Sequence, residues 1–201
     1  MQRLTNSQRA SLEAETARYQ KSVGQAEEYL LARGFTLATI EAARLGVDDD
    51  GRLSIPYLTR AGVVDIRTRC LKGHVCSEDF CVKYKSRPGT QGRIFGVSNL
   101  VTAGTWICIT EGELDSLILQ QLGYPAVGIP GAGAWKHHWK RVFEDFTRIF
   151  VFCDGDEAGK TFGTRFCTEI PLAEMVVCPT KQDVNSMFLS EGRTYFDGIL
   201  R

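Results

Sequence analysis

The stretch Ile149-Phe150-Val151-Phe152-Cys153-Asp154-Gly155-Asp156 joins an apolar run to a pair of carboxylates. A short, continuous apolar run of this kind predicts a strand that is buried on both faces of a sheet. The same pattern occurs upstream, where the apolar residues 107–110 precede the acidic cluster Glu111-Gly-Glu-Leu-Asp115. If the two strands are parallel neighbours, their carboxyl ends place Glu111, Asp154 and Asp156 along one edge of the sheet.

From Trp106 onward, apolar strands alternate with helical segments. We expect strands at 107–110, 126–129, 148–153 and 174–178, and helices at 114–122, near 135–143, at 158–170 and after residue 183. This alternation predicts an α/β fold with a parallel sheet that helices cover on both faces. Ligand sites in such sheets form at the carboxyl ends of the strands, where both acidic clusters fall.

The residues before this sheet have a different character. Residues 7–44 are rich in Ala, Leu, Glu, Gln and Arg, and they predict two or three helices that are interrupted at Gly24 and Gly34. Residues 53–58 and 63–69 predict a β-hairpin with its turn at 60–62. We therefore expect three parts: a helical lead-in at 1–51, a basic α+β subdomain at 52–100 and the α/β domain at 101–201.

The formal net charge of the chain is zero, but the charge is unevenly distributed. Residues 1–51 carry six basic and eight acidic side chains (net −2), residues 52–100 carry nine and three (+6), and residues 101–201 carry nine and thirteen (−4). A basic block beside an acidic block suits a polyanion that is held against a metal site. A solvated charged surface would give the same pattern.

The composition also bears on the cellular compartment. No apolar stretch approaches the length of a membrane span, and the first residues, Met-Gln-Arg-Leu-Thr-Asn, lack the apolar region of a secretion signal. The seven cysteines are an odd number, and several lie in strand-like runs, which favours reduced thiols over a disulfide framework. We expect a cytoplasmic protein with no membrane partner.

Carboxylates that share one edge repel one another, and their pKa values shift unless a cation lies between them. Magnesium suits this role because one or two carboxylates and the substrate phosphates hold it. Gly155 permits the turn that lets Asp154 and Asp156 face one site, and Asp115 lies one helical turn beyond Glu111. The alternative is that these acids only cap the helices that follow the strands. Two clusters, each after an apolar strand, favour the metal site and metal-assisted phosphoryl chemistry.

Three motifs carry a family resemblance: Glu111-Gly-Glu-Leu-Asp115, Asp154-Gly-Asp156-Glu-Ala-Gly-Lys160 and Lys181-Gln-Asp183-Val-Asn185. Together they resemble the TOPRIM domain of bacterial and phage DNA primases, a domain that topoisomerases and some nucleases also contain. Lys83-Tyr-Lys85-Ser-Arg87-Pro and Arg93-Ile-Phe-Gly resemble the basic segment that precedes this domain in primases. Residues 29–47 are similar to the helical lead-in of primases. The resemblance implies a TOPRIM-type parallel sheet sandwiched by helices and preceded by a small, basic helical and β subdomain.

The resemblance also implies roles for individual residues. Glu111 matches the metal-site glutamate, which has a base-like role, and Asp154 and Asp156 match the metal-binding pair. Asp183 matches the third acidic position, whereas Asn185 occupies a position where many relatives have a second aspartate. Lys83 matches a lysine that contacts the nucleotide or the template, and a second lysine of that segment is missing.

The glycine-rich turn at 128–133 is a further candidate, because its backbone amides could receive a phosphate, although a tight turn alone would also explain it. The expected catalytic residues are Glu111, Asp154, Asp156 and Lys83. The expected metal ligands are Glu111, Asp115, Asp154, Asp156 and Asp183. The expected contacts to nucleotide or nucleic acid are Lys83, Lys85, Arg87, Arg93, Gly131, Gly133 and Lys160.

The function that the resemblance implies is that of a phage-type primase catalytic core. Such an enzyme synthesises short RNA primers on single-stranded DNA by nucleotidyl transfer that depends on Mg²⁺ or Mn²⁺. Its implied partners are the single-stranded DNA template, ribonucleoside triphosphates, a replicative helicase and a separate zinc-binding primase module, since no such module precedes Gln25. A TOPRIM-type nuclease and a non-catalytic nucleic-acid-binding replication subunit remain alternatives.

Four residues of the basic segment have the side chains that zinc prefers: Cys70, His74, Cys76 and Cys81. Their spacing lacks the paired Cys-x2-Cys knuckles that mark a zinc site. We therefore expect an irregular basic loop at 70–91 with incidental thiols.

Overall fold

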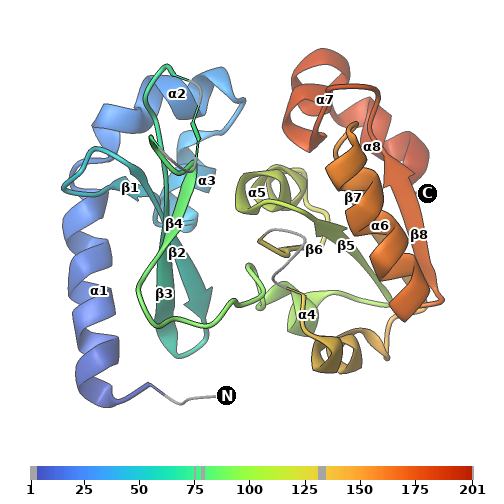
Figure 1. The fold of residues 1–201 in the computed structure, drawn as a ribbon, viewed down its shortest axis with the longest axis horizontal. Helices are drawn as coiled ribbons and strands as arrows, with labels where there is room; N and C mark the ends of the chain where they lie inside the picture. The colour runs from blue at the N-terminus through green and yellow to red at the C-terminus, as the bar shows by residue number, and fades with distance from the viewer. Residues whose placement is uncertain (1–3, 75, 78–79, 131–134, 201) are drawn as a thin grey trace. The chain divides into compact units, whose positions relative to one another are not determined.

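The computed structural model describes residues 4–74, 76–77, 80–130 and 135–200. The chain divides into two compact units, Met1–Gln91 and Gly92–Arg201 (Figure 1). Among the helices of the described ranges, none combines the length and the apolar character of a membrane span.

Four short helical segments open the first unit: α1 at Asn6–Gln20, η1 at Val23–Ala26, α2 at Glu27–Ala32 and α3 at Leu37–Ala42. The ends of these helices follow from local chemistry. Thr5 and Gln8 form a capping box at the start of α1, and the hydroxyl of Thr36 accepts a hydrogen bond from the Thr39 amide at the start of α3. Gly34 has a φ of 80°, a left-handed conformation that ends the preceding helix. Helices are present where we expected two or three of them, and they are interrupted at Gly34 as expected, whereas Gly24 lies within η1.

The sheet of the first unit is antiparallel, in the order β1-β2-β3-β4. Its strands are β1 at Gly46–Val47, β2 at Leu53–Thr59, β3 at Gly62–Arg69 and β4 at Tyr84–Ser86. The predicted hairpin is present as β2 and β3, and Leu12 of α1 packs against Val63 and Ile66 of β3. The strand β4 pairs with the end of β3, so the segment that we expected to be irregular contains a strand.

The sheet of the second unit has the order β6-β5-β7-β8, and every neighbouring pair is parallel. Its strands are β5 at Trp106–Thr110, β6 at Ala126–Gly128, β7 at Arg148–Cys153 and β8 at Ala173–Val177. The strands β5 and β7 are direct neighbours, and Thr110 pairs with Phe152 at their carboxyl ends. The predicted α/β fold with a parallel sheet is confirmed, and so is the adjacency of the two strands that precede the acidic clusters.

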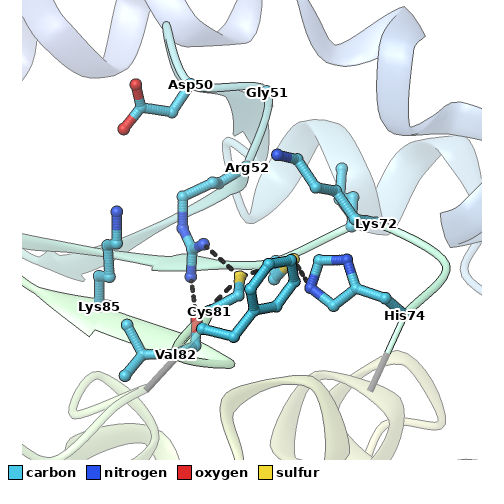
Figure 2. A pocket seen from close by; sticks show the side chains of 11 residues that line it. Asp50, Gly51, Arg52, Lys72, His74, Cys81, Val82 and Lys85 are labelled. Carbon is cyan, nitrogen blue, oxygen red and sulfur yellow. Dashed lines mark hydrogen bonds between the residues drawn. The ribbon is translucent and has the colours of Figure 1, made fainter. Parts of the chain in front are cut away.

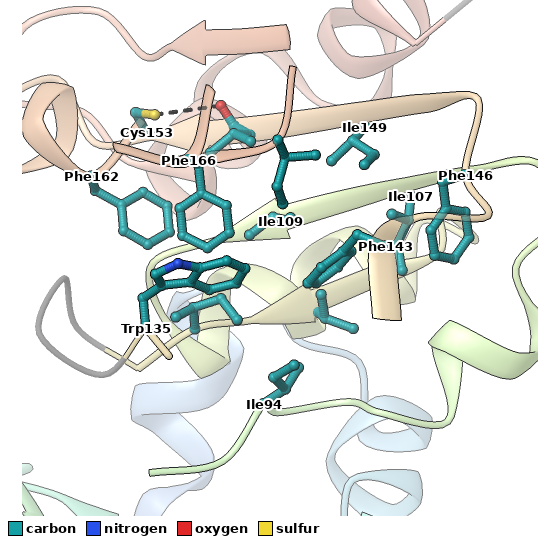
Figure 3. Packing of buried hydrophobic residues seen from close by; sticks show 14 residues of the cluster. Ile94, Ile107, Ile109, Trp135, Phe143, Phe146, Ile149, Cys153, Phe162 and Phe166 are labelled. Atoms are coloured by element: carbon teal, nitrogen blue, oxygen red, sulfur yellow. Dashed lines mark hydrogen bonds between the residues drawn. The ribbon is translucent and has the colours of Figure 1, made fainter. Parts of the chain in front are cut away.

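The remaining helices of the second unit are α4 at Asn99–Thr102, α5 at Glu113–Gln121, the 3₁₀ helix η3 at His137–Phe143, α6 at Glu157–Glu169, α7 at Val184–Glu191 and α8 at Arg193–Ile199. On one face of the sheet, Phe162 and Phe166 of α6 belong to the same buried cluster as Ile149 of β7 (Figure 3). On the other face, the ring of Phe152 lies 5.9 Å from that of Phe196 in α8. Alternate residues of β7 thus pack on opposite faces, as the unbroken apolar run predicts.

The loop after β7 lies directly against the loop after β8. The amide of Gly155 donates a hydrogen bond to the Gln182 carbonyl at 2.8 Å, and the Lys181 amide donates to the Gly155 carbonyl at 3.1 Å. A Cβ atom on Gly155 would lie only 1.8 Å from the carbonyl oxygen of Pro179, a backbone atom. Glycine is therefore required here because two backbones approach closely, and this approach brings the segment of Asp183 to the segment of Asp154.

We predict that Gly155→Ala destabilises the second unit by about 3 kcal/mol or more, because the added methyl group overlaps a backbone that is held by hydrogen bonds. Gly104→Ala is the matched control, since nothing lies within 4 Å of the Cβ position at Gly104. Urea unfolding followed by tryptophan fluorescence measures the effect, because all three tryptophans (106, 135 and 139) lie in this unit. Equal stability of the two variants would contradict the close approach.

Candidate active site

The two acidic clusters meet at the carboxyl ends of β5 and β7. Glu111 directly follows β5, Asp154 directly follows β7, and the backbone amide of Asp154 donates a hydrogen bond to Glu111 Oε1 at 3.2 Å. Both residues are partly buried. The hydroxyl of the buried Thr110 donates to the Gly112 carbonyl at 2.8 Å and stabilises the turn in which Glu111 lies. The parallel pairing of the strands thus brings the two sequence clusters into contact.

Asp156 and Asp183 cap the helices that follow them. Asp156 Oδ1 accepts a hydrogen bond from the Gly159 amide at 2.8 Å, and Asp183 Oδ1 accepts one from the Ser186 amide at 2.7 Å. The capping alternative is therefore realised for these two residues. Each of these caps is made through Oδ1, so capping and metal binding through Oδ2 are compatible.

Asp115 connects the first acidic cluster to the start of α7. Its Oδ1 accepts a hydrogen bond from the backbone amide of Asn185 at 3.2 Å. Asn185, at the position where the family resemblance implies a second aspartate, is buried, with 3% of its surface exposed. The side chain of an asparagine is easier to bury beside Asp115 than a second carboxylate, because it adds no charge.

The carboxylates affect one another's protonation. Burial raises the pKa of Glu111 above its ordinary value, and the charges of Asp156 and Asp115 raise it further, although the hydrogen bond from the Asp154 amide opposes this effect. The pKa of the buried Cys178 thiol rises to about 12, first because of burial and then because of four nearby carboxylates, Asp154, Asp115, Asp183 and Glu111. All five predicted metal ligands therefore lie within electrostatic reach of one small region.

This set of side chains fits a divalent cation. It offers only carboxylate oxygens, which are hard ligands. Burial, and then the charges of Asp156 and Asp115, raise the pKa of Glu111, and a cation would offset both effects. In the first unit, the ligand atoms of Cys70, His74, Cys76 and Cys81 lie within 4.8 Å of one another. Within the described ranges, the oxygens of the carboxylates are not grouped as closely as this. An open set suits Mg²⁺, which retains several waters and uses substrate oxygens as ligands.

The predicted basic contacts lie in both units. Lys83 and Lys85 are exposed at β4, and Arg87 forms an ion pair with Glu15 of α1. Lys160 is exposed on α6 and donates a hydrogen bond to Glu157 at 2.7 Å. Arg93 belongs to the second unit. Gly131 and Gly133 lie outside the described residues, so the phosphate-binding role expected of them stays a prediction.

Sequence reasoning missed features in each unit, and one of them, Cys178, lies close to the carboxylates of the second unit. Cys178 follows β8 as Asp154 follows β7, and its position at a strand end is the signal that could have identified it. Next to Lys85, the ring of Tyr84 has the guanidinium carbons of Arg67 and Arg69 at 4.7 and 5.2 Å from its centroid. In the first unit, the thiols that we expected to be incidental, those of Cys70, Cys76 and Cys81, lie together with His74, a grouping that their spacing in the sequence did not indicate.

Comparisons with known proteins agree with this architecture. A Toprim-like family model matches residues 108–188. The gene 57 protein of Mycobacterium phage D29 is 33% identical over 148 residues, which cover 71% of this chain and 93% of that protein. The DNA primase of Buchnera aphidicola (subsp. Acyrthosiphon pisum) is 24% identical over 135 residues, which cover 59% of this chain. The match spans only 23% of that primase.

Solved primase structures share the fold. The RNA polymerase domain of Mycobacterium tuberculosis primase DnaG matches with a TM-score of 0.77 and 20% identity, covering 96% of this chain and 82% of that domain. A DnaG primase catalytic domain bound to single-stranded DNA matches with a TM-score of 0.70 and 19% identity, covering 93% of this chain and 78% of that one. The chain therefore belongs to the family of the mycobacteriophage gene 57 protein, and it has the fold of a DNA primase catalytic core with a Toprim-like domain at residues 108–188.

Proposed function

We propose that this chain is the catalytic core of a primase, which synthesises short RNA primers on a single-stranded DNA template. The contact between Glu111 and Asp154 across neighbouring parallel strands carries the proposal. It joins the first two acidic motifs at the edge where parallel sheets bind their ligands, and the hydrogen bonds of Gly155 to Gln182 and of Asn185 to Asp115 bring the third motif to them. The DNA and polymerase functions named for the structural relatives agree with this assignment.

The proposed reaction joins two ribonucleotides. The 3′-hydroxyl oxygen of one attacks the α-phosphorus of a ribonucleoside triphosphate, the new P–O bond forms, and pyrophosphate leaves with the electrons of the bond that breaks. Bound Mg²⁺ or Mn²⁺ would neutralise the charge on the phosphates. Asp154, Asp156, Asp183 and Asp115 would hold the cations. Glu111, which burial makes a stronger base than an exposed glutamate, would accept the hydroxyl proton.

The first unit would supply the electrostatic part of template binding. Lys83 and Lys85 are exposed, Lys83 directly before the short strand β4 and Lys85 within it, and this strand is anchored by its pairing with β3. Lysines on a fixed strand can neutralise successive phosphates of a single strand without reading its sequence. A replicative helicase would then position the chain on the DNA, and a separate zinc-binding module would select the template.

We predict that Asp154→Asn and Asp156→Asn each lower primer synthesis by about 100-fold or more, since each removes a negative charge from the cation site. Asparagine at 156 retains the helix cap, so a loss of activity would report the missing charge and not the fold. Incorporation of labelled ribonucleotides on defined templates measures the effect, with the exposed Asp145→Asn as the control. Undiminished synthesis would rule out the proposed site. Template cleavage without incorporation would instead identify a nuclease.

We predict that the double variant Lys83→Ala/Lys85→Ala binds single-stranded DNA more weakly for every sequence. The slope of log affinity against log salt should fall by about 0.7 for each lysine that contacts a phosphate. Fluorescence anisotropy with a labelled oligonucleotide at several salt concentrations measures both quantities. Lys21→Ala, which removes another exposed lysine of the first unit, is the control. An unchanged slope in the double variant would exclude β4 from the template path.

The raised pKa of Glu111 predicts that replacing this carboxyl group by a neutral one stabilises the fold, although the same change removes the proposed base for primer synthesis. A carboxyl group with a raised pKa in the folded state destabilises the fold as the pH rises above its ordinary value of 4.5. Glu111→Gln, which retains the acceptor for the Asp154 amide, should therefore raise the melting temperature of the chelator-treated protein at pH 7. This gain should vanish below about pH 4.5, where the glutamate is protonated in both states.

Scanning calorimetry between pH 4 and pH 8 measures this difference, with the exposed Glu144→Gln as the control. Added Mg²⁺ should reduce the difference in melting temperature between the Gln variant and the wild type, because the cation offsets the negative charge of Glu111 in the wild type. A Glu111→Gln protein that is less stable than the wild type at pH 7 would contradict the electrostatic account.

A further inference from the structure

The connection between β3 and β4, residues 70–83 of the first unit, brings four soft ligands together. Its Cys70, His74, Cys76 and Cys81 each offer one ligand atom, and these atoms all lie within 4.8 Å of one another. Figure 2 shows the His74 ring and the Cys81 side chain turned toward one another inside a pocket. Three thiols and one imidazole form one of the common ligand sets of structural zinc sites.

The distances within this cluster are those of ligands around one ion. Cys70 Sγ lies 3.5 Å from Cys81 Sγ and 3.8 Å from His74 Nε2. Zinc–sulfur bonds of about 2.3 Å in a tetrahedron separate two sulfurs by about 3.8 Å. A disulfide requires about 2.05 Å, and all of the cysteines concerned are free. The spacing therefore matches a shared tetrahedral centre better than a covalent pair.

Arg52 gives independent support, because its charge needs a counter-charge. Its side chain is buried, with 6% of the residue exposed, and one of its terminal nitrogens lies 3.8 Å from Cys81 Sγ. The other hydrogen bonds of its guanidinium group among the described residues go to the neutral oxygens of Thr68, Val82 and Lys83, whereas its backbone amide donates to the Asp48 carboxylate. A buried cation is costly without a negative partner. One Zn²⁺ with three thiolates and a neutral imidazole has a net charge of −1, which supplies that partner.

The loop also needs a source of order. The described residues of the connection 70–83 form no helix or strand, and fixing such a loop costs conformational entropy. Its two ends are tied by the hydrogen bond that the Cys70 amide donates to the Lys83 carbonyl at 2.8 Å. The cluster adds a second tie, because Cys70 and Cys81 come from opposite ends of the loop.

We propose that Cys70, His74, Cys76 and Cys81 bind one Zn²⁺ in a closed, structural site. On binding, the three thiols release their protons to solvent, and the fourth ligand is the unprotonated Nε2 of His74. The site orders the loop that leads into β4 and so fixes the backbone of Lys83 and Lys85. It is separate from the carboxylate site of the second unit, and it holds whether or not the chain is a primase.

The test begins with the metal content of the purified full chain, measured by mass spectrometry after passage over a mild chelating resin. We expect about one zinc per chain in the wild type and in Cys167→Ser, which removes a thiol outside the cluster. Cys76→Ser/Cys81→Ser should contain no zinc. Asp154→Asn/Asp156→Asn should retain it, which shows that the acidic edge of the second unit does not hold the ion.

Cobalt substitution provides a readout that needs no variant. The Co²⁺ form of the wild type should show thiolate-to-cobalt charge transfer and the d–d absorption of a tetrahedral centre, and neither occurs with carboxylate ligands alone. A chain that contains no zinc and gives no such spectrum would overturn the proposal. Zinc retained by Cys76→Ser/Cys81→Ser would also overturn it, as would a Cys70–Cys81 disulfide in the freshly isolated protein.

Discussion

The parallel pairing of β5 with β7 is the constraint on which the site depends. The register that places Thr110 beside Phe152 ends the two strands within one residue of each other, so that the residues which follow them leave the sheet side by side. Glu111 and Asp154 are separated by 42 intervening residues, yet the contact between them, at 3.2 Å, follows from this register alone. A shift of one residue in either strand would also move every buried side chain to the opposite face. The core and the acidic edge are therefore specified by the same pairing.

The acidic edge is a place where stability and chemistry have opposite requirements. Helix N-termini and backbone amides hold Asp156, Asp183 and Asp115, which lowers the cost of gathering their charges. Among the residues that the structure describes, one backbone amide donates to Glu111, and burial still raises the pKa of this carboxyl group. The fold thus stabilises the negative charges of Asp156, Asp183 and Asp115, and it leaves the carboxyl group of Glu111 with a raised pKa. An unequal distribution of this kind is expected where a protein must bind a cation and also move a proton.

Much of this arrangement could be predicted from the sequence because it rests on local patterns. The bounds of β7 and the cap at Thr36 follow from an apolar run and from a hydroxyl before a helix. The link from Asp115 to Asn185 could not be predicted, because a backbone amide makes it across 70 positions. The strand β4 has only three residues, of mixed polarity, and exists because β3 offers it a partner. The thiol cluster was hidden by irregular spacing, since the loop and not a repeated knuckle brings its members together.

The close approach of Gly155 to Pro179 has a consequence for how this family can diverge. Backbone hydrogen bonds to Lys181 and Gln182 fix the number of residues between β8 and Asp183, so an insertion there would carry the aspartate away from its neighbours. The connection from β6 to β7 is longer, and among its described residues Trp135 and Phe143 are held by side-chain packing in the core. Homologues should accordingly differ in length at that connection, whereas the segment between β8 and α7 should tolerate changes of side chain but not of length.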